Sequence, residues 1–316
     1  MRRRKFLALV GGTAVWQLAA QAQEPGRVYR LGSLHQSPHD APHHVGLLAE
    51  LRKSGFTEGV NLIVDMRGYG AHPDQFPELA RSQVGAKVDA ILCGGEAAGR
   101  VAQQATTTIP LIVVADDMVR AGLATSLAKS GRNTTGISIL GTELDGKRQE
   151  GISHMAALSD PSSSTVSRLR ALEEGVRARG IKLSIQQVTR PEEIADAIAA
   201  AKATGAEALN VLASALLFNN SQIIMERTVA LRLPAIYQWP ETAEAHGFLG
   251  YGPRILHIYR DLISGQLIKL LRGAWAGEIP IEQPTRFELV INLKVAKTMG
   301  ITVPATLLAQ ADEVIE

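Results

Sequence analysis

The fold is decided by the stretch VDAILCGGEAAGRVAQQATTTIPLIVVADD, residues 88–117. It contains two largely apolar runs, residues 88–93 and 111–115, each of strand length. Between them an Ala-rich segment begins at Glu96 and predicts a helix. Strands that are apolar on both faces and joined by a helix are typical of a parallel sheet covered by helices on both sides. The stretch therefore predicts an α/β fold.

Both predicted strands end in residues that suit ligand binding. Gly94 and Gly95 follow the first strand, and Asp116 and Asp117 follow the second. Because parallel neighbours place their carboxyl ends on one edge, these residues should meet at the edge where open α/β sheets bind small ligands. The glycines would let a ligand approach the backbone, and the helix N-terminus would offer free N–H groups to an anion. A turn that only caps the helix would use the same residues.

The N-terminus predicts an export signal. It has four basic residues at positions 2–5, an apolar centre and the cleavage pattern Ala20-Gln21-Ala22, so we expect removal of residues 1–22 and a periplasmic protein. Residues 3–7, RRKFL, fit the twin-arginine pattern, although a Sec signal with a basic end would look similar. Cleavage lowers Lys plus Arg from 33 to 29 against 31 Asp plus Glu, which changes the formal net charge from +2 to −2.

Composition excludes several classes for the mature chain. It shows no basic patch, so we expect no nucleic-acid partner. Cys93 is the one cysteine, which rules out an intrachain disulfide. The chain after the signal, about 290 residues, is long enough for two lobes with cores of their own.

The remaining pattern predicts two similar halves. Residues 28–140 read as five strands with helices between them, including a helix at 122–129. Residues 155–251 repeat this rhythm, a long amphipathic helix follows at 255–272, and a helix at 303–316 closes the chain.

Motifs for catalysis are missing. The sequence contains no G-x-S-x-G, P-loop, G-x-G-x-x-G or H-E-x-x-H pattern, and Cys93 reads as a small apolar residue of a buried strand. Four histidines lie in the loop at residues 35–44, but their spacing matches no closed zinc pattern. We therefore expect a protein that is not an enzyme and that has no cofactor and no metal.

Carboxylates gather at the predicted loop ends. They could do acid–base chemistry, or they could hold an ammonium group, and the second role fits the missing nucleophile motifs better. These residues are Glu96, Asp116, Asp117, Asp160 and Glu241.

Several longer segments follow one another over nearly the whole chain: RRRKFLALVGG, LRKSGFTEGVNL, ATTTIPLIVV, GRNTTGISILGTELDGKR, LPAIYQWPETAEAHGFLGYGP and QPTRFELVINLKVAKTMGITVPATLLAQADEVIE. In their residues and their order they resemble one family, the periplasmic substrate-binding proteins of ABC transporters, in the group that includes tryptophan- and tyrosine-binding members.

The resemblance implies a hinged type I periplasmic-binding-protein fold with two Rossmann-like lobes and parallel sheets. Lobe 1 would comprise residues 28–140 plus about 252–278, and lobe 2 residues 141–251 plus about 279–316, with candidate hinges near Gly141 and Gly250. The protein would be a monomer that captures a small polar ligand, such as an amino acid, and delivers it to an inner-membrane permease. The alternatives are a periplasmic α/β hydrolase or isomerase, or the ligand-binding subunit of a membrane sensor.

The resemblance also places the ligand contacts at strand ends. Carried over by position, they fall on Ser33, Gln36, Gly95, Glu96, Asp116, Asp117, Ser159, Asp160, Ser214, Tyr237 and Trp239. In one segment the chain departs from the family. After Glu150 the family normally continues the helix for another two or three turns, and this chain lacks about ten of those residues. A crossover between parallel strands usually needs a dozen residues or more. A distorted start of lobe 2 is the expected consequence.

Overall fold

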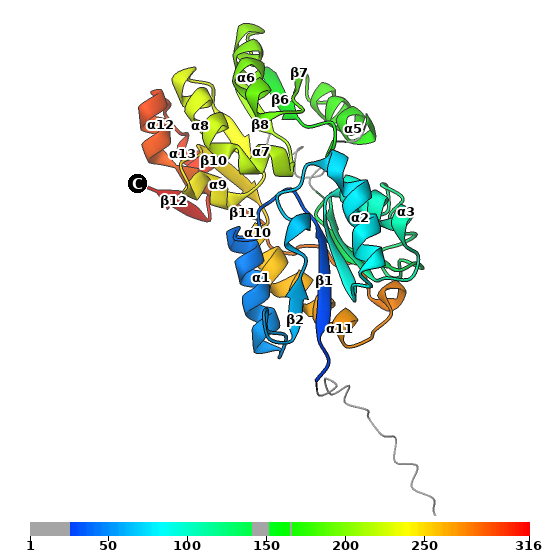
Figure 1. Cartoon of the computed structure of the whole chain (residues 1–316). Helices are drawn as coiled ribbons and strands as arrows, with labels where there is room; N and C mark the ends of the chain where they lie inside the picture. The colour runs from blue at the N-terminus through cyan, green and yellow to red at the C-terminus, as the bar shows by residue number, and fades with distance from the viewer. Residues whose placement is uncertain (1–25, 141–151, 165) are drawn as a thin grey trace, which may run out of the picture.

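The computed structural model describes residues 26–140, 152–164 and 166–316. The chain forms two lobes, each built on its own sheet, and the expected α/β fold with two mainly parallel sheets is confirmed (Figure 1). Within the described residues, no helix combines the length and apolar character that a membrane span requires. The expected shortening of the crossover after Glu150 and the hinge at Gly141 lie outside the described residues.

The first sheet has the strand order β2-β1-β3-β4-β5, and each neighbouring pair is parallel. Its strands are β1 (Tyr29–Leu34), β2 (Leu62–Val64), β3 (Ala90–Gly94), β4 (Leu111–Ala115) and β5 (Thr134–Ser138). The helices connected to them are α1 (Pro42–Lys53), η1 (Met66–Gly68), η2 (Pro73–Gln75), α2 (Phe76–Gly85) and α3 (Glu96–Ala105).

The stretch that predicted the fold lies at the centre of this sheet. Strands β3 and β4 pair in the register Cys93↔Val113, and the side chains of both strands are buried up to Cys93 and Ala115. One face packs on α2 and α3, whereas the other packs on α1 and on helices that return from later in the chain. Burying one large aliphatic side chain of this kind contributes roughly 1.5–3 kcal/mol, so these two strands supply much of the apolar stabilisation of the first lobe.

The second sheet has the order β12-β11-β10-β9-β8-β6-β7, with β10 and β11 as its antiparallel pair. Its strands are β6 (His154–Ser159), β7 (Lys182–Gln187), β8 (Ala208–Val211), β9 (Ala235–Tyr237), β10 (Leu249–Gly252), β11 (Glu288–Asn292) and β12 (Glu313–Ile315). Its helices are α5 (Val166–Arg177), η3 (Pro191–Glu193), α6 (Ile194–Ala203), α7 (Ala215–Asn219), α8 (Ser221–Ala230), α9 (Pro240–Glu244), α12 (Leu293–Met299) and α13 (Ala305–Leu308).

After β10 the chain returns to the first lobe. One continuous helical stretch, α10 (Ile255–His257), the π-helical η4 (Ile258–Ile263) and α11 (Ser264–Leu271), packs its apolar side into the core of the first sheet (Figure 1). After η5 (Ala276–Glu278), Glu282 forms a parallel bridge with Ile137 of β5 before β11 joins the second sheet. The chain thus passes between the sheets after β5, after β10 and after Glu282. Gly250, a candidate hinge, lies inside β10, where it pairs with Val290 and Tyr237.

Two expected helices are wrong. Residues 122–129 form turns, because the hydroxyl groups of Thr125 and Ser126 bind nearby backbone carbonyls and so compete with helical hydrogen bonds. At the C-terminus, only Ala305–Leu308 is helical, and Glu313–Ile315 becomes strand β12 beside β11. Here pairing with the open edge of the second sheet decides the conformation. The local sequence does not show that this edge is available.

Cys93 should be unreactive and dispensable for binding. Its side chain is fully buried in β3, and burial raises the pKa of the thiol. We expect no reaction with a thiol reagent in the folded protein and full reaction after denaturation. Cys93→Ala should lower the free energy of unfolding by roughly 1 kcal/mol and leave ligand affinity within a few-fold. Rapid labelling of the native protein would contradict this.

Candidate functional site

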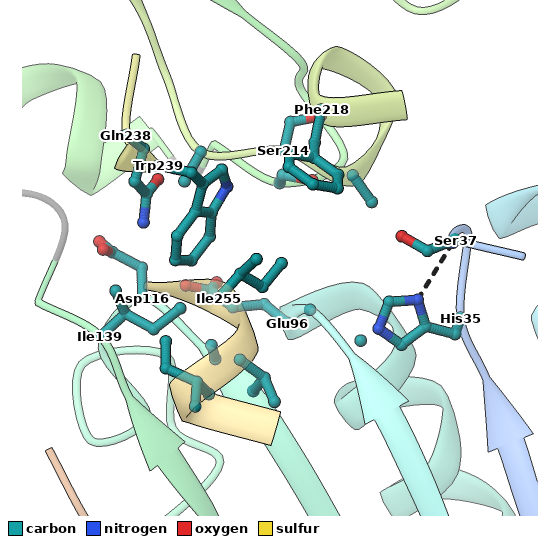
Figure 2. Close-up of a pocket in the computed structure, with 18 of the residues that line it drawn as sticks. His35, Ser37, Glu96, Asp116, Ile139, Ser214, Phe218, Gln238, Trp239 and Ile255 are labelled. Atoms are coloured by element: carbon teal, nitrogen blue, oxygen red, sulfur yellow. Dashed lines mark hydrogen bonds between the residues drawn. The ribbon is translucent and has the colours of Figure 1, made fainter. Parts of the chain in front are cut away.

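A cavity lies between the lobes, at the carboxyl ends of β1, β3 and β4. Its empty volume is about 740 Å³ when the open mouth is included. Figure 2 shows Gln238, Trp239 and Asp116 on one side of the cavity, and His35 and Ser37 on the other. Residues of both lobes therefore enclose the same space.

The first lobe contributes two carboxylates to this cavity. Glu96 is the first residue of α3 and is 8% exposed, and Gly95 before it has a φ of 110° that brings the helix N-terminus to the sheet edge. Burial and, secondly, the carboxylate of Asp116 raise the pKa of Glu96 to about 7. A positive group placed beside this pair would favour the ionised form of Glu96.

The second lobe contributes a guanidinium group. Arg168 of α5 is 3% exposed and lines the cavity, with Nε 3.7 Å from Oδ2 of Asp116 across the cleft. Arg100 lies on the outer side, 3.8 Å from Glu96, and half of its side chain is exposed. Among the described residues, two carboxylates of one lobe and one buried guanidinium of the other therefore line the cavity.

Aromatic and aliphatic side chains form the rest of the wall. Trp239, which follows β9, Phe218 of α7 and Tyr259 of η4 all line the cavity, together with Ile139 and Ile255. The cavity is therefore mostly apolar, with its charged groups gathered on one part of its wall.

The two lobes also touch directly: the Ser37 hydroxyl donates to Asn219 Oδ1 at 3.2 Å, and Asn219 Nδ2 donates to the carbonyl of Gln36 at 3.1 Å.

Five of the expected contact residues line this cavity: Gly95, Glu96, Asp116, Ser214 and Trp239. Ser214 donates a hydrogen bond to Asp160 at 2.7 Å.

The other expected contacts lie elsewhere. Gln36 and Asp160 line a second hollow, and Asp160 accepts hydrogen bonds from Ser162 and Ser163 that shape its own turn. Asp117 accepts the backbone N–H groups of Val119 and Arg120 and so caps a turn. The rest are buried outside the cavity lining, namely Ser33, Ser159 and Tyr237.

Sequence reasoning missed important lining residues. Gln238 directly precedes Trp239, which was an expected contact, and this adjacency could have identified Gln238 as a lining residue. Ser37 directly follows Gln36, and Phe218 lies four residues after Ser214, both of which were expected contacts. Arg168 and Tyr259 had no local signal, because each looks like an ordinary residue of an amphipathic helix.

Below the cavity lies a cluster of buried histidines, His35, His43 and His44, whose ligand atoms fall within 4.8 Å of one another. His35 Nδ1 accepts the N–H of Ser37 at 3.0 Å, so its Nε2 carries the proton that is directed to the Tyr259 hydroxyl at 2.6 Å. Both nitrogens of His35 are therefore engaged, and coordination by a neutral His35 would require one of these bonds to break. The arrangement fits a neutral structural cluster better than a three-histidine metal site.

The histidine cluster should make the protein sensitive to acid. Burial lowers the pKa of His43 to about 3 and of His44 to about 4, and it also holds the pKa of His35 well below its usual value. Between these values and 6.5 the unfolded chain binds more protons, so the free energy of unfolding should fall as pH is lowered through this window. Each histidine contributes a slope of up to about 1.4 kcal/mol per pH unit.

Denaturant titrations from pH 7.5 to 4 would measure this slope. His43→Phe should reduce this slope by about the contribution of one histidine. The same substitution at the exposed His246 serves as the control. An unchanged slope in His43→Phe would show that this ring does not carry the effect.

A family model described as ABC transporter substrate binding protein matches residues 37–315. Among curated proteins, none matches this chain.

Solved structures share the fold at low sequence identity. A conserved domain protein from Vibrio cholerae has a TM-score of 0.81 and 23% identity, covering 91% of this chain and 100% of its own. The ABC domain from Streptococcus pneumonia in complex with L-Trp has a TM-score of 0.78 and 19% identity, with coverage of 91% and 100%. The ligand-free, open structure of a substrate-binding protein with adhesive properties from Clostridium difficile has values of 0.60 and 21%, with coverage of 91% and 99%.

The family match spans most of the chain, and the resemblance seen in the sequence is confirmed. The family consists of non-enzymatic binding proteins, so the hydrolase or isomerase alternative falls away. This chain belongs to the family of ABC transporter substrate-binding proteins.

Proposed function

We propose that this substrate-binding protein captures a small molecule with a protonated amine, a carboxylate and an apolar or aromatic body, as in an amino acid. The observation that carries the proposal is the charge arrangement of the cavity, in which Glu96 and Asp116 of one lobe face Arg168 of the other. An ammonium group would lie beside the acid pair and a carboxylate beside Arg168, so each charge of the ligand would face an opposite charge of the protein.

The apolar wall supports the same class of ligand. Trp239 and Phe218 offer ring faces on which an aromatic or aliphatic body can pack, which adds apolar contact area to the charged recognition. The structural match from Streptococcus pneumonia holds L-Trp, an amino acid with such a body. A free amino acid is therefore the ligand class to test first.

We further propose that lobe 1 comprises residues 28–140 plus about 252–278, and lobe 2 residues 141–251 plus about 279–316. Ligand binding would close the lobes, and the contacts of Asn219 with Ser37 and Gln36 would stabilise the closed form. A monomer in this closed form would then deliver its ligand to a permease of the inner membrane.

The acid pair should control affinity. A charged hydrogen bond in a closed cleft contributes about 1.5–3 kcal/mol, so Asp116→Asn and Glu96→Gln should each weaken amino-acid binding about 10- to 100-fold. Calorimetry measures this directly once a thermal-shift screen has identified the ligand. Asp117→Asn is the matched control, because Asp117 caps a turn outside the cavity lining and should alter stability rather than affinity.

The same pair predicts a pH dependence. Because an ammonium needs an ionised Glu96, affinity should rise between pH 6 and 8, by at most about tenfold per unit. The rise should disappear in Glu96→Gln. Unchanged affinity in both Asp116→Asn and Glu96→Gln would remove the reason for preferring a cationic head group.

We also propose export and cleavage of residues 1–22. Mass spectrometry of the periplasmic fraction should find a mature chain that starts near Gln23 and carries no lipid. A retained N-terminus or a lipid adduct would contradict this.

A further inference from the structure

Gln238 stands out among the residues that line the cavity. It directly follows β9, it is 2% exposed, and both its Nε2 and its Oε1 are buried without a hydrogen-bond partner in the described part of the chain. Buried amides are nearly always hydrogen-bonded, because an unsatisfied donor or acceptor keeps its full desolvation cost. An unsatisfied amide on a cavity wall indicates that something in the cavity completes it.

The backbone around Gln238 is rigidly held. A Cβ atom on Gly250 would lie 2.7 Å from the carbonyl oxygen of Trp239 and 2.8 Å from Cα of Pro240, so the loop packs directly on strand β10. The Trp239 carbonyl also accepts the N–H of Thr242 at 3.0 Å, where α9 begins. Gln238 is therefore presented to the cavity from a firmly held backbone.

The charged groups of the cavity lie on the same wall. Asp116, next to Gln238 in Figure 2, forms its ion pair with Arg168, and Glu96 lies close enough for Asp116 to influence its ionisation. A carboxamide offers an acceptor and a donor side by side. It is complementary to a ligand head group that carries a donor and an acceptor on neighbouring atoms.

We propose that Gln238 is a specificity-determining residue that reads both halves of an amino-acid head group, Oε1 accepting from the ammonium and Nε2 donating to the carboxylate. This inference rests on the proposed function and adds a selection rule to it. Either half alone leaves one atom of the amide unsatisfied, so the protein should reject amines without the carboxylate and acids without the amine. Sites that hydrogen-bond a substrate group discriminate strongly against analogues that lack it.

The first test is Gln238→Met, which keeps the length of the side chain and removes both polar atoms. Affinity for an amino acid should fall about 10- to 100-fold, whereas the melting temperature of the ligand-free protein should stay the same or rise, because a costly buried amide has been removed. Gln83→Met is the matched control. Gln83 is also fully buried, and its Oε1 likewise has no partner in the described part of the chain, but its Nε2 donates to the carbonyl of Ser33 at 2.7 Å outside the cavity lining, so its loss should lower stability and leave affinity alone.

The second test varies the ligand. After a screen of the L-amino acids, wild type and variants are titrated with the best binder, with the amine that lacks its carboxylate and with the acid that lacks its amine; for tryptophan these are tryptamine and indole-3-propionate. Wild type should prefer the amino acid over both analogues by at least tenfold, and Gln238→Met should lose part of both preferences. Gln238→Glu, which exchanges the donor for a negative charge, should weaken amino-acid binding and shift preference toward the amine.

The outcomes separate the two proposals. An amino acid that binds with unchanged affinity and unchanged selectivity in Gln238→Met and Gln238→Glu overturns the role of Gln238 and leaves the proposed function standing. A screen in which no amino acid binds overturns both.

Discussion

Everything at the binding edge depends on one electrostatic constraint: the carboxylates of Glu96 and Asp116 are largely removed from water. Two like charges at such an edge destabilise each other, and burial adds to the cost. Arg168 reduces this cost from across the cleft, 3.7 Å from Asp116. Because this cation belongs to the other lobe, its attraction to Asp116 acts only when the lobes lie together, which couples the charges of the cavity to the closure of the cleft.

The apolar part of the chamber depends on the same approach of the lobes. Trp239 and Phe218 come from the second lobe, yet both pack with the core of the first sheet, and Tyr259 reaches this place on the helical stretch that returns after β10. The π-helical segment η4, a type of irregularity that is frequent at functional sites, carries Tyr259 at this point. Beneath it the neutral histidines connect β1, α1 and η4. The core of the first sheet and the wall of the cavity are therefore one continuously packed structure.

Local sequence predicted the parts of the site that arise from a single strand end. Gly95, Glu96 and Asp116 follow buried strands, so their position at a strand end indicated the cavity, whereas Trp239 was expected from the family resemblance. The same rule also selected Asp117, although its carboxylate binds the N–H groups of its own turn. The end of a strand places the backbone at the edge of the sheet. Whether a carboxylate there caps its own turn or faces the cleft depends on hydrogen bonds that cannot be read from the sequence.

The sequence by itself determined the α/β class, the parallel strands of the first lobe and the family, because doubly apolar strands and long ordered motifs are local properties. Only the tertiary structure decided the rest. It replaced the helix expected at 122–129 by turns, and it made Glu313–Ile315 a strand, because a hydroxyl network and an open sheet edge outweighed weak helical preference. It also brought Arg168, Gln238 and Tyr259 into one cavity from three distant segments. Their convergence depends on how two sheets and a returning helix pack together, a long-range relation that no stretch of the chain contains.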